Sequence, residues 1–140
     1  MRCFSIEAFR VLPASIGAQL FPPAGSGKTS FAKSLSLNFF EADQYFEKFN
    51  NNKFDHKLLK EAHRYCYDLV KKELFNGNSA VVSNTMSTIN EVLEYQNLAK
   101  EMNVKFVSMI LENRHDGISV HDVPKDSIEK MSERFDIQLK

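Results

Sequence analysis

The sequence is poor in the residue types that mark disulfide-rich, zinc-binding or glycine- and proline-rich proteins. It contains no tryptophan, and its 140 residues include only five glycines, four prolines and two cysteines. The two cysteines, Cys3 and Cys66, are far apart in the chain and outside any paired-ligand spacing. We therefore expect neither a disulfide framework nor a structural zinc site.

An excess of charge of one sign is also absent. Eighteen basic residues offset eighteen acidic ones, so the formal net charge is zero at pH 7. This balance argues against a protein that binds duplex DNA through bulk positive charge, and it leaves only a local basic patch open.

Long apolar runs are missing as well. No stretch approaches the roughly 20 apolar residues that a membrane-spanning helix needs. The first 21 residues mix charged and apolar side chains and lack the continuous apolar stretch of a secretory signal. We expect no membrane association and a cytoplasmic location, and the length suits a single domain.

What the sequence does contain is an alternation of strand-like and helix-like segments. Short apolar or β-branched runs predict strands at residues 16–21, 39–42, 80–82 and 104–111. Apolar spacing and capping residues predict helices over residues 28–37, from Asp55 to Gly77, from the capping box Thr88–Glu91 to about residue 99, and from Pro124 onward. This alternation predicts an α/β fold with a parallel sheet covered on both faces, where ligands bind beyond the carboxyl ends of the strands.

The turn after the first predicted strand reads Pro22-Pro23-Ala24-Gly25-Ser26-Gly27-Lys28-Thr29. It matches the phosphate-loop pattern G-x-x-x-x-G-K-[ST] at every position except the first, where Pro22 replaces glycine. Backbone N–H groups around Gly25, Ser26 and Gly27 are expected to surround a phosphate, with Lys28 on the β- and γ-phosphates and the Thr29 hydroxyl on Mg²⁺. Ser30 completes the predicted nucleotide-binding segment. The alternative is a glycine-serine turn that only caps the following helix.

Three further residues are candidates for chemistry. Asp43 ends the second predicted strand, where its carboxylate could take a proton from an attacking hydroxyl or bind Mg²⁺ through water; alternatively it caps a helix over residues 44–49. Asn84 follows the third strand and could contact a substrate, or it could simply shape the turn. Arg114 lies in a polar stretch over residues 112–124 that could form a lid over the transferred phosphate, or an ordinary surface loop.

With these motifs in this order, the sequence resembles the P-loop kinase-like ATP-binding proteins around polynucleotide kinase. That group includes small phage and bacterial AAA-type ATPases and predicted kinases. The resemblance covers about residues 16–136 and is carried by segments 24–32, 42–46, 54–55, 61–63, 82–85 and 119–124. It implies a P-loop NTPase three-layer sandwich with a short, mostly parallel sheet of strand order 2-3-1-4 and a polar lid. It also implies a domain over residues 16–140, preceded by an N-terminal extension, residues 1–15, that could be disordered.

The resemblance implies Mg²⁺ and ATP as ligands and assigns roles to individual residues. Lys28 and Thr29 would bind phosphate and Mg²⁺, Asp43 would activate the acceptor, and Arg114 would be the lid arginine. The leading hypothesis is a kinase that transfers the γ-phosphate to a hydroxyl acceptor, for which a nucleic acid 5′-hydroxyl is the candidate. Pro22 and Ser83 depart from the family pattern, because related proteins often have aspartate at the position of Ser83. One alternative is therefore an ATP-binding module without transferase activity. A separate alternative is a nucleotide hydrolase, which would release phosphate to water without an acceptor.

Overall fold

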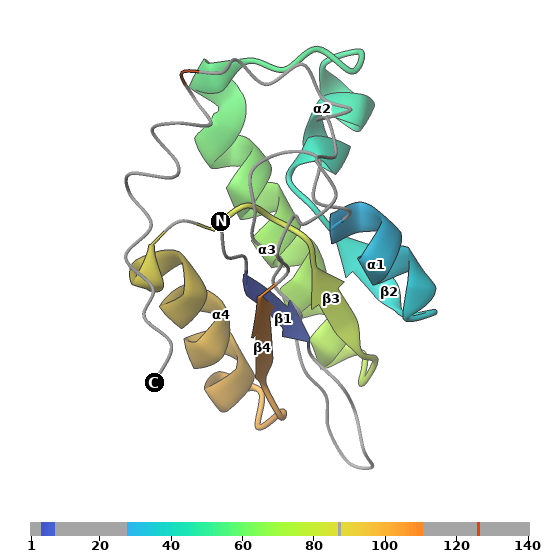
Figure 1. The fold of residues 1–140 in the computed structure, drawn as a ribbon, viewed down its shortest axis with the longest axis vertical. Coiled ribbons are helices and arrows are strands. Elements are labelled where there is room, and N and C mark those ends of the chain that lie inside the picture. The colour runs from blue at the N-terminus through green and yellow to red at the C-terminus, as the bar shows by residue number, and fades with distance from the viewer. Residues whose placement is uncertain (1–3, 8–27, 87, 111–125, 127–140) are drawn as a thin grey trace.

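The computed structural model describes residues 4–7, 28–86, 88–110 and 126, which build an α/β fold around a small sheet (Figure 1). In chain order the elements are β1 (Phe4–Glu7), α1 (Lys28–Ser34), β2 (Asn38–Phe40), α2 (Asp43–Phe49), the 3-10 helix η1 (His56–Leu58), α3 (Leu59–Phe75), β3 (Ala80–Val82), α4 (Ile89–Glu101) and β4 (Val107–Ile110). No helix in these described ranges is long and apolar enough to cross a membrane.

The four described strands lie side by side in the order β2-β3-β1-β4. β2 and β3 are parallel, with Asn38 opposite Ala80 and Phe40 opposite Val82. β1 runs antiparallel to both of its neighbours, β3 and β4. Three of the four strands therefore share one direction, and their carboxyl ends lie at the same edge of the sheet.

The strand β1 differs from what the sequence led us to expect. Its residues, Phe4–Glu7, belong to the segment that we predicted to be an extension outside the domain, yet they pair with β4 over four residues. The alternation of apolar and polar residues in this segment is the period of a strand, and pairing on both sides satisfies its backbone groups. The strand predicted over residues 16–21 lies outside the described residues. The predicted strand order 2-3-1-4 used residues 16–21 as its first strand, so the described strands do not show that order. The predicted domain limits stay a prediction.

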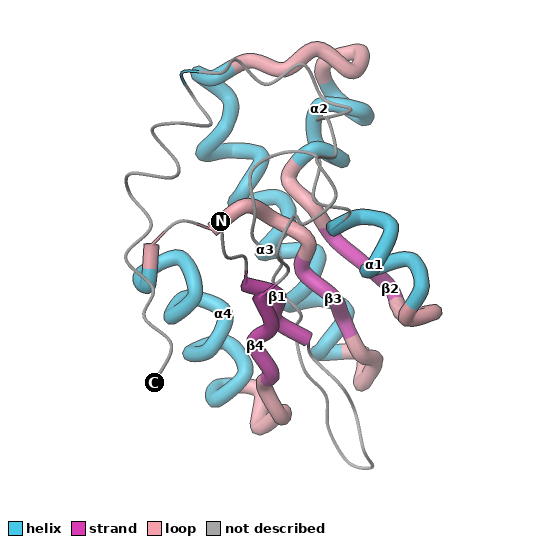
Figure 2. Tube along the Cα trace, in the orientation of Figure 1, coloured by secondary structure: helices cyan, strands magenta, loops and turns pink. Residues whose placement is uncertain are grey.

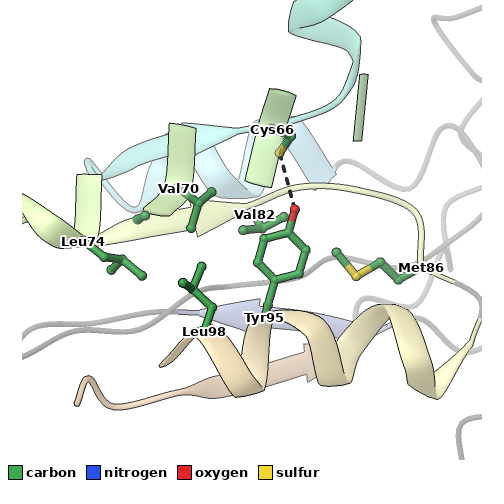
Figure 3. Close-up of a cluster of buried hydrophobic side chains, with 8 residues drawn as sticks. Cys66, Val70, Leu74, Val82, Met86, Tyr95 and Leu98 are labelled. Carbon is green, nitrogen blue, oxygen red and sulfur yellow. Dashed lines mark hydrogen bonds between the residues drawn. The ribbon is translucent and has the colours of Figure 1, made fainter. Parts of the chain in front are cut away.

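Helices cover both faces of the sheet, and β3 shows how. Val81 packs against Ala32 of α1 on one face, whereas Ala80 and Val82 lie in a second cluster on the other face. Because successive strand residues point to opposite faces, three consecutive apolar residues can serve both layers. The buried members of the second cluster come from β3, α3, α4 and the loop after β3: Cys66, Val70, Leu74, Ala80, Val82, Met86, Tyr95 and Leu98 (Figure 3).

The start of α4 and the end of α3 are where the sequence predicted them, whereas the start of α3 and the end of α1 differ. Thr88 and Glu91 form the expected capping box of α4, and Gly77 takes the expected positive φ of 81° just after α3. Asp55 accepts a hydrogen bond from the backbone of Lys57, so it caps η1, which leads into α3. α1 ends at Ser34 rather than at residue 37, and Ser36 has a positive φ of 54° that a continuing helix cannot accommodate.

The limits of two strands also differ from the prediction. The expected second strand, over residues 39–42, is observed as β2 over Asn38–Phe40, so Asp43 is the first residue of α2 rather than the end of the strand. The expected fourth strand is β4, which begins at Val107 rather than at residue 104. The helix predicted from Pro124 and the lid over residues 112–124 lie outside the described residues.

Candidate functional site

The candidate site lies at the carboxyl ends of β2 and β3. The loops that follow these two parallel strands leave the sheet at the same edge, where the loop after β2 leads into α2 and the loop after β3 runs towards the beginning of α4 (Figure 2). Five polar residues gather there from separate parts of the chain: Thr29, Glu41, Asp43, Ser83 and Asn84. The parallel pairing of β2 and β3 is what brings the last four of them together.

Thr29, the predicted metal ligand, is tied to the end of β2. Its hydroxyl Oγ1 donates a hydrogen bond of 2.9 Å to Oε2 of Glu41. Glu41 is only 8% exposed, which is uncommon for an acidic side chain unless it is bonded. The contact joins the first turn of α1 to the residue that directly follows β2.

Asn84 is used inside the protein rather than presented at its surface. Its Oδ1 accepts a hydrogen bond of 2.7 Å from the backbone N–H of Ala42, and its Nδ2 donates one of 3.3 Å to Sγ of Cys66. The side chain is 4% exposed. The sequence left two roles open for Asn84; these bonds show that it shapes the turn, and its contact with a substrate stays a prediction.

The Asn84 contact continues through the second cluster. The Tyr95 hydroxyl also donates to Sγ of Cys66, at 3.7 Å, so the thiol links α3 to α4 (Figure 3). Burial raises the pKa of the Cys66 thiol to about 11, against the opposing effect of these two hydrogen bonds. Burial likewise raises the pKa of Tyr95 well above its ordinary value. Both groups are therefore neutral at physiological pH, and this part of the site is a fixed polar network without charge.

Asp43, the predicted acceptor-activating carboxylate, is half-buried at the start of α2. An acidic side chain in the first turn of a helix is favourably placed, because the helix N-terminus carries partial positive charge. The two residues before Asp43 are each held by the site: Glu41 bonds Thr29, and Ala42 bonds Asn84. The position of Asp43 relative to α1 and β3 is therefore set by these two contacts.

His63 of α3 shares its surroundings with Asp43. Burial lowers the pKa of this half-buried imidazole, while the carboxylates of Glu91, Asp43 and Glu94 act in the opposite direction. At this point α3 faces the beginning of α2, because Ala62, the residue before His63, packs with Ala42 and Phe46.

The remaining predicted residues divide into two groups. Lys28 is the first residue of α1, and Ser30, in the same turn, is exposed. Pro22, Gly25, Ser26, Gly27 and Arg114 lie outside the described residues, so their predicted roles stay predictions.

Two residues of the site were missed by the sequence analysis. Glu41 was passed over in favour of Asp43, although its separation from Phe39 gave a usable signal: strand alternation puts residues 39 and 41 on one face. Cys66 was read only as part of an amphipathic helix. Nothing in its local sequence indicated that it accepts hydrogen bonds from Asn84 and Tyr95.

The described residues suit a hard cation held largely by its substrate. No group of three His, Cys, Asp or Glu side chains that could hold a metal ion occurs among the residues that the structure describes. The Thr29 hydroxyl and the Glu41 carboxylate supply oxygen atoms, which is the ligand type that Mg²⁺ prefers. Mg²⁺ commonly takes only one or two protein ligands and completes its shell with phosphates and water, so the residues present fit this ion.

A comparison with known protein families is consistent with this geometry. Residues 22–123 match the model of the AAA domain family, from the start of the phosphate loop to just before Pro124. The chain belongs to the AAA domain family. Its members are P-loop NTPases and include kinase-like proteins. Nucleotide binding follows from this membership, and the α/β fold with its short parallel β2–β3 pair is consistent with it.

Proposed function

We propose that this AAA domain protein is a Mg²⁺- and ATP-dependent kinase that transfers the γ-phosphate to a hydroxyl acceptor. The observation that carries the proposal is the placement of Asp43. Its carboxylate begins the helix after β2, and its preceding residues are bonded to Thr29 through Glu41 and to Asn84 through Ala42. A carboxylate that directly follows these two anchored residues, at the edge of the sheet where the phosphate-loop threonine is bound, is suited to act on a hydroxyl that approaches the γ-phosphate.

In the proposed reaction the acceptor oxygen forms a bond to the γ-phosphorus while the bond from that phosphorus to the β–γ bridging oxygen breaks. ADP leaves with the electron pair, and the acceptor proton passes to the Asp43 carboxylate. Lys28 binds the β- and γ-phosphates, with Gly25, Ser26, Gly27 and Ser30 in the nucleotide-binding segment and Arg114 on the transferred phosphate. Thr29 would hold Mg²⁺, which when bound would neutralise part of the phosphate charge.

The resemblance to polynucleotide kinase supports a nucleic acid 5′-hydroxyl as the first acceptor to test. The zero net charge of the chain means that such an end would be bound locally rather than through a broad basic surface. A single-stranded oligonucleotide with a free 5′-hydroxyl is therefore the first substrate, and the same oligonucleotide with a 5′-phosphate is its control.

The test has a binding arm and a transfer arm. Titration calorimetry should show Mg·ATP binding that Lys28→Ala weakens about tenfold or more, because a charge-assisted contact to phosphate is lost. Transfer from radiolabelled ATP should fall about 10²- to 10⁴-fold in Asp43→Asn while ATP affinity is kept, as expected for the loss of a general base.

Asp68→Asn is the matched control, because Asp68 is an exposed carboxylate of α3 that pairs with Arg64 at the surface. It should behave as the unmodified protein in both arms. Full transfer by Asp43→Asn would overturn the assignment of the base. ATP binding with no transfer to any hydroxyl would instead favour the nucleotide-binding module, and release of phosphate to water without an acceptor would favour the hydrolase.

A further inference from the structure

Three oxygen-bearing side chains lie on the α1 face of the sheet at the edge where β2 and β3 end. Alternation along β3 places them: Val81 packs against α1, and Val82 packs against the opposite cluster. The next residue, Ser83, therefore falls on the α1 face. Asn84 confirms that the alternation continues, since its amide reaches Cys66 on the other face.

Glu41 reaches the same face from β2. Phe39 packs against the α1 cluster and Phe40 against the opposite cluster, so Glu41 returns to the α1 face, where its carboxylate meets Thr29. The two strands remain adjacent beyond their regular pairing, because the backbone N–H of Ser83 donates to the carbonyl of Phe40 at 2.8 Å. Glu41 and Ser83 are thus neighbours across the end of the sheet.

The Ser83 hydroxyl is the unusual member of this group. Ser83 is 4% exposed, and its Oγ is a buried polar atom with no hydrogen-bond partner in the part of the chain that the structure describes. A buried hydroxyl without a partner is costly, and native proteins usually satisfy such groups with protein, water or a ligand. Its neighbours on this face are the Thr29 hydroxyl and the Glu41 carboxylate. Such a set of oxygen atoms suits a metal ion with its bound water molecules.

We propose that Glu41 and Ser83 complete, with Thr29, the site that holds Mg²⁺ for the nucleotide. Thr29 Oγ1 donates to Glu41 in the structure; in the loaded site the Thr29 oxygen would face the ion, and Glu41 and Ser83 would bind its water ligands. Groups that hold metal-bound water typically change metal affinity tenfold to a hundredfold when they are removed. The inference rests on the proposed function, because it concerns the ion that accompanies ATP.

The experiment measures ATP affinity by titration calorimetry over a range of Mg²⁺ concentrations and in excess chelator. Glu41→Gln keeps a side-chain oxygen that can accept from Thr29 and removes only the charge. We expect it to raise the Mg²⁺ concentration needed for half-maximal ATP affinity about tenfold or more. ATP affinity in chelator should be kept or should improve, because a negative charge beside the phosphates is lost.

Glu47→Gln is the control, since Glu47 is an exposed carboxylate of α2. Ser83→Ala is the second variant: it removes an unsatisfied hydroxyl and should fold at least as well as the unmodified protein, yet shift the Mg²⁺ dependence in the same direction as Glu41→Gln.

The outcomes separate this inference from the function on which it rests. Absence of Mg²⁺-dependent ATP binding by the unmodified protein would overturn the proposed function itself. If that binding is present but both variants keep the same Mg²⁺ dependence, only the roles of Glu41 and Ser83 fail. Equal losses of ATP affinity with and without Mg²⁺ would also overturn those roles, because they would indicate a structural effect.

Discussion

The side-chain oxygen of Asn84 accepts a 2.7 Å hydrogen bond from the backbone N–H of Ala42, the residue directly before Asp43. The same side chain donates to Cys66 of α3. One buried amide therefore joins the end of β3, the start of α2 and the middle of α3. It thereby anchors the residue next to the candidate catalytic carboxylate of Asp43.

Replacing Asn84 should cost stability. In Asn84→Ala the buried backbone N–H of Ala42 loses its acceptor, and we expect a decrease of about 1–3 kcal/mol in the free energy of unfolding, measured by urea denaturation. Asn97→Ala, an exposed asparagine in α4, is the control and should change stability little or slightly for the better, because alanine favours helix. Equal stability of the two variants would contradict the role given to Asn84.

Cys66 should be unreactive while the protein is folded. Its thiol is buried, and its raised pKa of about 11 leaves little thiolate at neutral pH. In a Cys3→Ser background, labelling by a disulfide reagent at about pH 8 should be about a hundredfold or more slower in the native protein than in urea. Rapid labelling under native conditions would show that the packing of α3 against β3 and α4 is open on the time scale of the experiment.

His63 should make the protein less stable at mildly acidic pH. Burial lowers the pKa of folded His63 below its ordinary 6.5, so the unfolded chain binds the proton more readily. The stability that neutral His63 contributes is present above about pH 6.5 and is lost as the pH falls towards the folded pKa. Urea denaturation at about pH 7.5 and about pH 5.5 should show a smaller decline for His63→Gln than for the unmodified protein.

The control for this measurement is His56→Gln, because His56 is exposed in η1. Its decline between the two pH values should match that of the unmodified protein. A decline in His63→Gln as steep as that of the unmodified protein would contradict the prediction, because it would mean that the carboxylates of Glu91, Asp43 and Glu94 cancel the effect of burial on the pKa of the imidazole.

The sequence by itself determined the features that depend on a few neighbouring residues. The capping box of Thr88 and Glu91 and the positive φ of Gly77 arise from contacts within about one helical turn, and the apolar spacing along α3 marks the face that is buried. The alternation of helices and strands predicted the α/β class, and the phosphate-loop motif predicted nucleotide binding, which membership in the AAA domain family supports. Local hydrogen bonding and side-chain periodicity are enough for these inferences.

Tertiary structure alone decided the composition of the site. Thr29 and Glu41 are 12 residues apart in the chain, and Ala42 and Asn84 are 42 apart, so neither contact has a local signal. The strand β1 is four residues long and finds its partner β4 about a hundred residues later, so its short alternation could not be distinguished from an extension. Which polar side chains meet at the carboxyl edge depends on which strands are neighbours and on which face each residue takes, because a shift of one residue reverses every face.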